Sequence, residues 1–433
     1  MLTMEIILQL ALDLLNGDRA LKIASEAQKA GPLWIEAGTP LIKSEGMDII
    51  RKLRETFPET EIIADLKTMD TGAVETEMAA KAGATIVCVL GAAHDETIKE
   101  AVESGRKYGA KIMVDLIGVK DTVTRAQEIE SFGVDYFCVH IGIDEQMEGI
   151  RPKETVKALV KQTSIPVAVA GGINSETVSD LIQLGASIIV VGGAITKATD
   201  VTESTQTMMQ AIHKQQKIPS ALFKKYDHSS LKKAFNLVST SNISDAMHRK
   251  GAMKDIVPVR KGYHMIGPAL TVETIDGDWA KPVEAIDKAQ KGTVLVINAS
   301  GGKTAIWGEL ATWSAQIKKL AGVVIDGAVR DIDDLKTMDL PIFTRYMVPN
   351  AGEPKGFGDI GTEIICGNQY VQTGDWIVGD DSGVVVIPKD QAQTIANRAL
   401  DVKEHENRIR EEIKKGGSLA SVLKLKKWEK KIG

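Results

Sequence analysis

The amino-acid sequence predicts an α/β protein in which an N-terminal (β/α)8 barrel is fused to a C-terminal mixed α/β domain. The chain has 433 residues, which is beyond the size at which a single hydrophobic core stops growing. Short apolar runs alternate with helix-like segments over residues 1–212, as in parallel βαβ units. Residues 213–230 lose this period and are expected to be a linker, 231–400 to form the mixed domain, and 401–433 to be a charged helical tail.

Eight apolar runs within residues 1–212 are the expected barrel strands. They are residues 8–14, 33–38, 62–67, 86–91, 111–117, 136–141, 167–172 and 188–193. Helix-like segments lie between them, and the one at 174–185 begins with a capping Asn174 or Ser175 and ends at Gly185. Eight units in about 200 residues fit a barrel. A doubly wound open sheet is the alternative, but it rarely reaches eight uninterrupted units.

Composition and charge argue against several classes of function. A net charge of −5 and an aromatic content of 4% do not suit a nucleic-acid-binding surface, which needs basic residues and stacking platforms. No apolar run approaches the roughly 18 residues of a membrane span, and the N-terminus lacks the features of a signal peptide. Cys88, Cys138 and Cys366 are far apart, so we expect reduced core cysteines and a cytoplasmic protein.

Chemically active side chains follow several of the expected barrel strands. In a (β/α)8 barrel the active site lies at the C-terminal ends of the strands. The candidates at these ends are Asp13, Glu36, Asp65, Lys67, Asp70 and His140. Carboxylate oxygens suit Mg²⁺, and a histidine can carry protons near neutral pH. This set is what a metal-assisted proton transfer needs.

Glycine pairs follow the seventh and eighth expected strands. Gly171-Gly172 and Gly192-Gly193 occur where barrels of this kind commonly bind phosphate through bare backbone N–H groups. A double glycine by itself is more often a turn. Its occurrence after both of the last two strands indicates a substrate that carries a phosphate.

Six short motifs of the first domain carry a resemblance to a known superfamily. They are LALD (10–13), IEAGTP (35–40), DLKTMD (65–70), VHIGIDEQ (139–146), AGGI (170–173) and VGGAI (191–195). Together they resemble the orotidine-monophosphate-decarboxylase superfamily and are most similar to its hexulose-phosphate synthase branch. The resemblance implies that Glu36 and Asp65 hold Mg²⁺, that Lys67 lies against the substrate oxygens, and that Asp70 reaches into the partner's site of a barrel dimer.

The resemblance also implies a reaction. The hexulose-phosphate synthases condense ribulose 5-phosphate with formaldehyde to 3-hexulose 6-phosphate, or run the reverse cleavage, and His140 would then carry the C1 proton. The 3-keto-L-gulonate-6-phosphate decarboxylases are the alternative. They carry one arginine three residues beyond the histidine and another in the eighth-strand motif, where this sequence has Ile143 and Gly193. True orotidine-monophosphate decarboxylases do not need the metal ligand at Glu36.

A second group of candidate residues lies in the C-terminal domain, whose expected strands are residues 267–274, 292–300, 321–328, 340–347 and 375–388. Glu309 is separated by twenty residues from the pair Arg330-Asp331. An arginine can form a bidentate pair with a carboxylate ligand, and a neighbouring aspartate can hold a metal or its water. A surface Arg–Asp pair after a strand is the alternative interpretation.

Motifs of the second domain carry another resemblance. They are SNISDAM (241–247), GPALTV (267–272), GDWAKPVEAID (277–287), GTVLVINA (292–299), GVVIDGAVRD (322–331) and GDWIVGDDSGVVVIP (374–388). They resemble the family of the ribonuclease-activity regulator A, which also includes the class II 4-hydroxy-4-methyl-2-oxoglutarate aldolases. In those aldolases the motif starts with Asp, where this chain has Glu309. The resemblance implies that Arg330 binds a pyruvate carboxylate and that Asp331 supports a divalent metal.

The two resemblances imply self-association. A barrel dimer and a trimer of the second domain would together give a larger homo-oligomer, such as a hexamer. The expected partners are a sugar phosphate and formaldehyde, with a ribonuclease as a further partner only if the second domain acts as a regulator. We expect neither a membrane nor a nucleic acid as a direct partner.

Overall fold

The computed structural model describes residues 6–220, 222–423 and 425 and divides the chain into two compact units. The barrel unit consists of Met1–Lys225 together with Glu404–Gly433, and the second unit is Tyr226–Lys403. The expected tail at 401–433 therefore starts inside a helix, α17 (Ala392–Lys414). Lys424 and residues 426–433, the end of that expected tail, lie outside the described residues.

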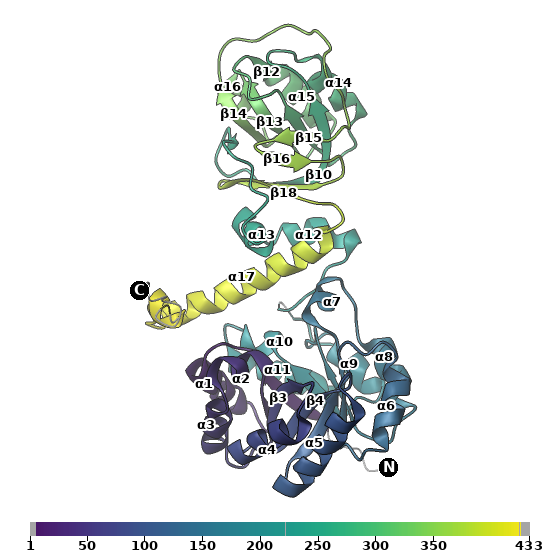
Figure 1. Ribbon diagram of the computed structural model, residues 1–433. Helices are drawn as coiled ribbons and strands as arrows, with labels where there is room; N and C mark the ends of the chain where they lie inside the picture. Colours follow the sequence, from purple (N-terminus) through teal and green to yellow (C-terminus); the bar gives the residue numbers. More distant parts are fainter. Residues whose placement is uncertain (1–5, 221, 424, 426–433) are drawn as a thin grey trace, which may run out of the picture. The chain divides into compact units, whose positions relative to one another are not determined.

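The first eight strands form a closed parallel barrel, as predicted (Figure 1). The strands are β1 (Ile7–Leu12), β2 (Trp34–Ala37), β3 (Ile62–Thr68), β4 (Ile86–Leu90), β5 (Lys111–Asp115), β6 (Tyr136–His140), β7 (Val167–Ala170) and β8 (Ile188–Val191). They pair in sequence order, and β1 closes the ring by pairing with β8. Both faces of such strands are covered, which explains why they read as continuous apolar runs.

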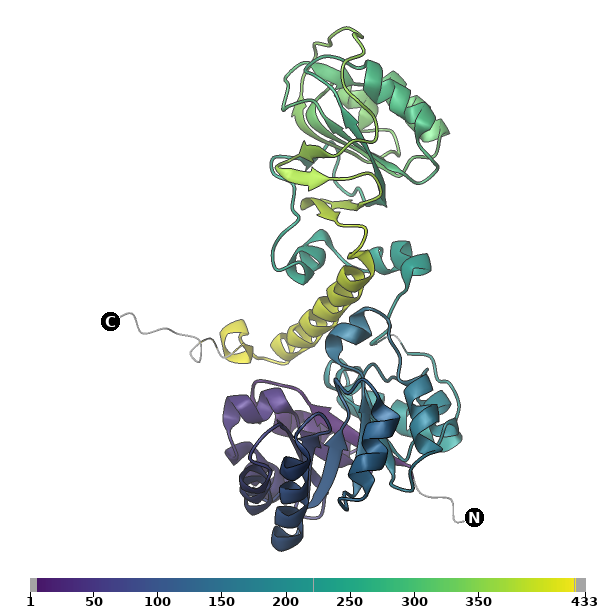
Figure 2. The ribbon, with the colours of Figure 1, turned by 45° about the vertical axis from the view of Figure 1, so that its right-hand side comes forward.

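Helices surround this barrel (Figures 1 and 2). They are α1 (Gly17–Gln28), α2 (Thr39–Glu45), α3 (Asp48–Thr56), α4 (Gly72–Ala82), α5 (Asp95–Tyr108), α6 (Thr122–Glu130), α7 (Ile143–Met147), α8 (Lys153–Val160), α9 (Val178–Gln183), α10 (Gly193–Thr196) and α11 (Val201–Lys214). The short helices α2, α7 and α10 lie at the C-terminal end of the barrel, where they contribute residues to a cavity. Helix α9 begins later than predicted. The Asn174 carboxamide accepts backbone N–H groups of Glu176 and Thr177 in a turn that precedes the helix.

The second unit is built on a mixed sheet. Its strands are β9 (Val257–Pro258), β10 (Met265–Glu273), β11 (Val294–Asn298), β12 (Ala305–Trp307), β13 (Gly322–Val329), β14 (Ile342–Met347), β17 (Trp376–Asp380) and β18 (Gly383–Ile387), and a separate pair is β15 (Ile364–Cys366) with β16 (Gln369–Val371). Strands β10, β11, β13 and β14 are parallel neighbours, and β9 and β17 pair antiparallel at the two sides. The prediction of one strand at 375–388 was wrong, because the chain reverses after Asp380 and forms the β17–β18 hairpin.

The remaining helices are short apart from α17. They are η1 (His228–Ser230), α12 (Leu231–Phe235), α13 (Thr240–Ala246), α14 (Ala280–Lys288), α15 (Glu309–Ile317), α16 (Ile332–Leu335) and α18 (Leu419–Val422). Among the described residues, no helix combines the length and the apolar character that crossing a membrane requires. Cys88, Cys138 and Cys366 are free and buried, as predicted.

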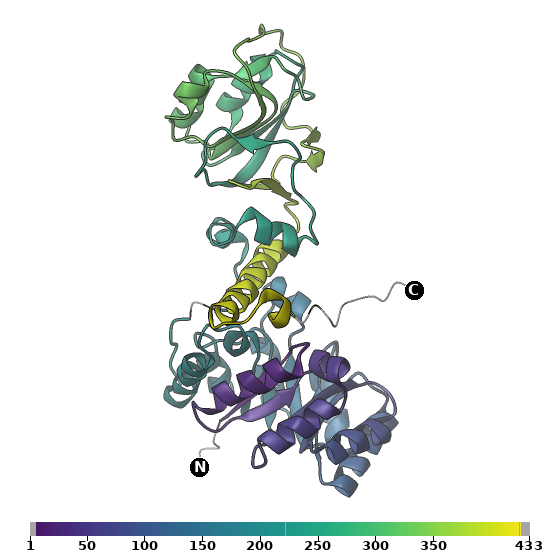
Figure 3. The same ribbon diagram turned by 90° about the vertical axis from the view of Figure 1, so that its left-hand side faces the viewer.

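The last part of α17 packs on the barrel unit (Figure 3). Arg408 is 2% exposed, and its guanidinium donates to the carbonyl oxygens of Ala198 and Thr199. It also pairs with Glu26 of α1 and with Glu412 one turn further along α17. A fully buried guanidinium needs this many partners, because an unpaired buried charge is strongly destabilising.

Candidate active site of the barrel

A cavity of about 480 Å³ lies at the C-terminal ends of the barrel strands. The predicted residues that line it are Asp13, Glu36, Asp65, Lys67, His140, Gly171, Gly172, Gly192 and Gly193. Asp70 does not line it. Its side chain is exposed and accepts a hydrogen bond from the backbone N–H of Thr71. The structure thus brings together the predicted barrel set except Asp70, whose action across a dimer stays a prediction.

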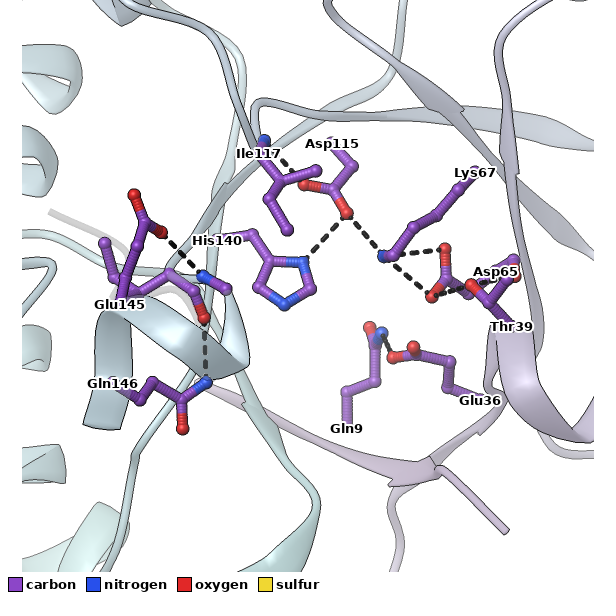
Figure 4. A network of polar contacts seen from close by, with 12 residues as sticks. Gln9, Glu36, Thr39, Asp65, Lys67, Asp115, Ile117, His140, Glu145 and Gln146 are labelled. Atoms are coloured by element: carbon purple, nitrogen blue, oxygen red, sulfur yellow. Dashed lines mark hydrogen bonds and ion pairs between the residues drawn. The ribbon is translucent and has the colours of Figure 1, made fainter. Parts of the chain in front are cut away.

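Lys67 lies between two buried aspartates at the end of β3 (Figure 4). Its Nζ is 3.0 Å from Oδ2 of Asp65 and 2.9 Å from Oδ2 of Asp115. The pairing of β3 with β4 is irregular at this point, and Lys67 adopts a left-handed backbone with φ +50°. Burial acts to lower the pKa of Lys67, but the charges of Asp115 and Asp65 outweigh it and raise the pKa. The lysine therefore stays protonated and acts as a fixed positive charge.

Asp115 is the site residue that the sequence reasoning missed. It is the last residue of β5, is 4% exposed, and accepts the backbone N–H of Ile117. Its Oδ2 also lies 2.9 Å from Nδ1 of His140. Burial acts to raise the pKa of Asp115, but His140 and Lys67 outweigh it and hold the pKa at about 2. Because the ionised carboxylate only accepts, Nδ1 of His140 carries the proton and Nε2 is left as the acceptor.

Carboxylates crowd the side of the cavity that faces β1 and β2. Gln9 donates from Nε2 to Oε2 of Glu36 at 2.6 Å, while Oε1 of Gln9 is buried and has no hydrogen-bond partner. Burial and the charges of Asp65 and Asp13 raise the pKa of Glu36 well above its ordinary value. Solvent reaches Asp13 through the cavity, but protein encloses the carboxylate on its other sides. This loss of solvation raises the pKa of Asp13, and the negative charge of Asp65 raises it further.

This donor set fits a divalent cation. In the described part of the chain, no three His, Cys, Asp or Glu side chains are arranged as a complete metal cluster. Mg²⁺ in enzymes commonly uses only one or two protein carboxylates and completes its shell with substrate oxygens and water. Glu36 and Asp65 supply two such carboxylates, and the repulsion that raises the pKa of Glu36 is what a cation relieves. The unpartnered Oε1 of Gln9 adds a neutral oxygen beside them.

The two glycine pairs line the same cavity, and Gly192 lies next to Asp13 because β8 pairs with β1. Gly171 and Gly172 adopt left-handed conformations, with φ +101° and +69°, which other residues rarely adopt. A side chain at Gly171 would also collide with the carbonyl oxygen of Ile141. Gln146 reinforces this turn by donating to that carbonyl at 2.8 Å. The geometry therefore explains why the sequence has glycine at this position.

The candidate residues of the second unit form a surface cluster. The backbone N–H of Glu309, at the start of α15, donates to Oδ2 of Asp331 at 3.1 Å. Nε of Arg330 lies 3.5 Å from the same oxygen. The side chains of Arg330 and Asp331 are 45% and 35% exposed. The structure brings the three residues together, and their binding of a carboxylate ligand and a metal stays a prediction.

Comparison with known proteins gives separate matches for the two halves of the chain. The family model for orotidine 5'-phosphate decarboxylase / HUMPS matches residues 7–208, and the model for Aldolase/RraA matches residues 240–386. A 3-hexulose-6-phosphate synthase of Bacillus subtilis (strain 168) is 44% identical over 208 residues, which are 47% of this chain and 98% of the relative. A 3-hexulose-6-phosphate synthase of Staphylococcus epidermidis is 40% identical over the same length, with the same coverage of both chains.

A solved structure resembles the second half. It is the crystal structure of Streptomyces coelicolor RraAS2, described as an unusual member of the RNase ES inhibitor RraA protein family. It is 26% identical, covers 43% of this chain and 98% of its own, and superposes with a TM-score of 0.40. The expected kinship of each half is confirmed by these matches.

Proposed function

The chain belongs to the orotidine 5'-phosphate decarboxylase / HUMPS family through its barrel, and from this premise we propose that the barrel is a 3-hexulose-6-phosphate synthase. The reaction is the aldol condensation of ribulose 5-phosphate with formaldehyde, or its reversal. The observation that carries the proposal is the chain of contacts Asp65–Lys67–Asp115–His140 within one cavity. It joins a fixed positive charge to an oriented base beside two carboxylates.

The first step is removal of the C1 proton of ribulose 5-phosphate to give an enediolate. His140 takes this proton at Nε2, because Asp115 holds the ring by Nδ1 and stabilises the imidazolium that forms. Lys67 stays protonated and stabilises negative charge on the substrate oxygens. The enediolate carbon then forms a bond to the formaldehyde carbon, and the new alkoxide takes up a proton.

A divalent cation on Glu36 and Asp65 would act as a Lewis acid on the substrate's oxygens when bound. The residues of the chain prepare for it in two ways. Gln9 fixes Glu36 through a hydrogen bond of 2.6 Å. Thr39 donates from Oγ1 to Oδ2 of Asp65 at 2.9 Å, which fixes the second carboxylate. Both carboxylates are therefore oriented before substrate binds.

Decarboxylation of a keto-gulonate phosphate is the competing barrel reaction. It would call for an arginine in place of Gly193, as noted from the sequence. In this structure a side chain at Gly193 would collide with the ring of Phe223. The space that such an arginine needs is filled, which favours the synthase reaction.

The decisive assay uses the purified full-length chain with ribulose 5-phosphate, formaldehyde and Mg²⁺. We expect formaldehyde-dependent formation of 3-hexulose 6-phosphate, and loss of at least about 90% of the rate after EDTA treatment, with recovery on adding Mg²⁺. Keto-gulonate 6-phosphate in the same assay is the control. Release of CO2 from it at a higher kcat/KM than condensation would overturn the proposal.

For the second domain we propose aldol chemistry on a pyruvate-type substrate, with Arg330 binding the carboxylate and Asp331 supporting a divalent metal. The match of residues 240–386 to Aldolase/RraA and the closeness of Glu309, Arg330 and Asp331 support it. Regulation of a ribonuclease is the other role open to this family. Turnover of 4-hydroxy-4-methyl-2-oxoglutarate by the full chain would favour the first role, and inhibition of a ribonuclease without such turnover would favour the second.

Self-association is part of the proposal. Met69, Val74 and Met78 are 54%, 57% and 44% exposed next to Asp70, and they support a barrel dimer through this face. Leu310, Trp313 and Ile317 are exposed on α15 and support self-association of the second domain. We expect light scattering to give a multiple of the 46.7 kDa chain mass. Met78→Glu should lower that mass, whereas Ile150→Glu, at another exposed apolar residue, should not.

A further inference from the structure

Residues 222–225 lie between the two halves in the sequence, yet one of them, Phe223, lines the barrel cavity. Phe223 is a lining residue, is 8% exposed, and sits directly against Gly193 of the second glycine pair. Its backbone has φ +57°, a conformation that a phenylalanine keeps only when surrounding contacts impose it. Part of the predicted linker is thus a wall of the site.

The turn after β7 holds this segment. Nδ2 of Asn174 donates to the carbonyl oxygen of Phe223 at 3.4 Å, and Asn174 is 4% exposed. Ser175 and Ile218 exchange hydrogen bonds, with Oγ donating to the Ile218 carbonyl at 2.8 Å. Lys224 pairs with Glu176 at 2.9 Å. The segment is therefore attached to the same turn that carries the first glycine pair.

Two lysines flank the Phe223 ring. Nζ of Lys197 lies 5.4 Å from the ring centroid, and Nζ of Lys225 lies 4.5 Å from it. Lys197 follows Gly192-Gly193 in the chain and also lines the cavity. A cation is attracted to the face of an aromatic ring within about 6 Å. The ring thus holds the Lys197 ammonium beside the glycine pair, where the phosphate of a sugar phosphate would bind.

Glu404 of helix α17 also holds the backbone of Phe223. Oε1 of Glu404 accepts the backbone N–H of Phe223 at 2.7 Å. Glu404 lies one turn before Arg408, whose guanidinium is buried against Ala198 and Thr199, the residues after Lys197. One helix face therefore contacts both Phe223 and the chain that follows the second glycine pair.

We propose that Phe223, held by Glu404, is a positioning residue that places the ammonium of Lys197 on the phosphate group of the barrel's substrate. This rests on the proposed sugar-phosphate function. The matched Bacillus subtilis synthase is covered over 98% of its own length by 208 residues. Residues 222–225 and 404–412 lie outside the range 7–208 that the family model matches, and they add contacts to the cavity of this barrel.

Steady-state kinetics of the full-length chain test the inference. Phe223→Ala should raise the KM for ribulose 5-phosphate about tenfold and the inhibition constant of inorganic phosphate by a similar factor, with a smaller change in kcat. Phe223→Tyr keeps the ring face and should stay within about twofold of the wild type. Glu404→Ala should raise the KM about threefold, because the backbone of Phe223 loses one of its anchors.

Matched variants control for general damage. Phe132→Ala removes a ring that also contacts a lysine, Lys99 at 4.9 Å, but does not line the cavity. Glu411→Ala removes an α17 carboxylate that pairs with Lys414. Both should leave the KM within about twofold. An unchanged or lowered KM in Phe223→Ala, in a wild type that condenses formaldehyde, would overturn the inference.

Calorimetric titration with ribulose 5-phosphate, without formaldehyde, separates the two proposals. If the wild type binds the sugar phosphate but does not condense it, the proposed reaction fails. Weaker binding by Phe223→Ala, with unchanged binding by Phe132→Ala, then still supports the positioning role. Equal binding by both variants rejects that role whatever the reaction is.

Discussion

The two groups of charged residues that the sequence singles out have different surroundings. In the barrel, Asp65 and Asp115 are 5% and 4% exposed, and Lys67 joins them. In the second unit, Arg330 and Asp331 are 45% and 35% exposed, and their contacts come from neighbours in sequence or from one helix start. The first group comes from several strands that meet at one end of the barrel, and the second lies on a surface.

This contrast shows that burial decides how strongly a charged side chain depends on its neighbours. A buried carboxylate loses its water shell and depends on partners, so each member of the barrel group constrains the others. An exposed pair is screened by solvent and contributes little by itself. Substitutions in the barrel group should therefore affect chemistry and stability together, and those in the surface group should affect only the binding of a ligand of their own.

The largest effect is expected from Asp65→Ala. The variant loses one of two carboxylates beside the substrate and one partner of Lys67, so condensation should fall about a thousandfold or more. Circular dichroism should still report a folded barrel, because the alanine leaves Lys67 paired with Asp115. Turnover near that of the wild type would contradict the role of Asp65 as a metal ligand.

Asp115→Asn should lower kcat by about a hundredfold, because an amide no longer fixes the His140 tautomer. It should also lower the free energy of unfolding by about 2 kcal/mol, since the pKa of Asp115 is held at about 2 against an ordinary 3.8. Because the pKa of Asp115 is lower in the folded state, its ionised carboxylate stabilises the fold fully above pH 3.8. This contribution to the free energy of unfolding is lost as the pH falls toward about 2. Denaturant titrations should therefore give a constant difference from pH 8 to 5 that narrows only below about pH 4. A difference that widens on acidification would contradict the ion-pair assignment.

The smallest effect is expected from Arg330→Ala. Formaldehyde condensation should stay within about twofold of the wild type, and the free energy of unfolding should change by less than about 0.5 kcal/mol, as for other exposed residues. Any pyruvate-type aldol turnover should disappear in the same variant. A tenfold lower rate of condensation in Arg330→Ala would show that the charged group of the second unit affects the reaction in the barrel. The two groups would then not be independent.

Much of the fold was predictable because the barrel's periodic pattern is local. The eight apolar runs became eight strands, and the strand-end rule placed Asp65, Lys67 and His140 in one cavity. The hairpin β17–β18 was missed even though the turn residues Asp381 and Ser382 followed by Gly383 signalled a reversal within residues 375–388. An uninterrupted apolar pattern on both sides hid the turn.

The rest of the site depends on contacts between distant parts of the chain. Asp115 ends an apolar strand without any motif, and its role appears only when it meets Lys67 and His140, which are 48 and 25 residues away. A search for acids at all eight strand ends would have found it. Phe223 carried no signal, because an aromatic residue in an irregular segment does not reveal which surface it will contact.

The division of the barrel unit into Met1–Lys225 and Glu404–Gly433 has a consequence for synthesis on the ribosome. The eight strands are complete early, but Glu404 and Arg408 are made only after the whole second unit, Tyr226–Lys403. At about 5–20 residues per second this delay is on the order of 10–40 s. During that time the nascent barrel lacks the hydrogen bond from the backbone of Phe223 to Glu404. It also lacks the hydrogen bond from the Arg408 guanidinium to the carbonyl oxygen of Ala198. The cavity that we propose to bind a sugar phosphate is therefore completed last in a new chain, when the C-terminal helix packs on the barrel.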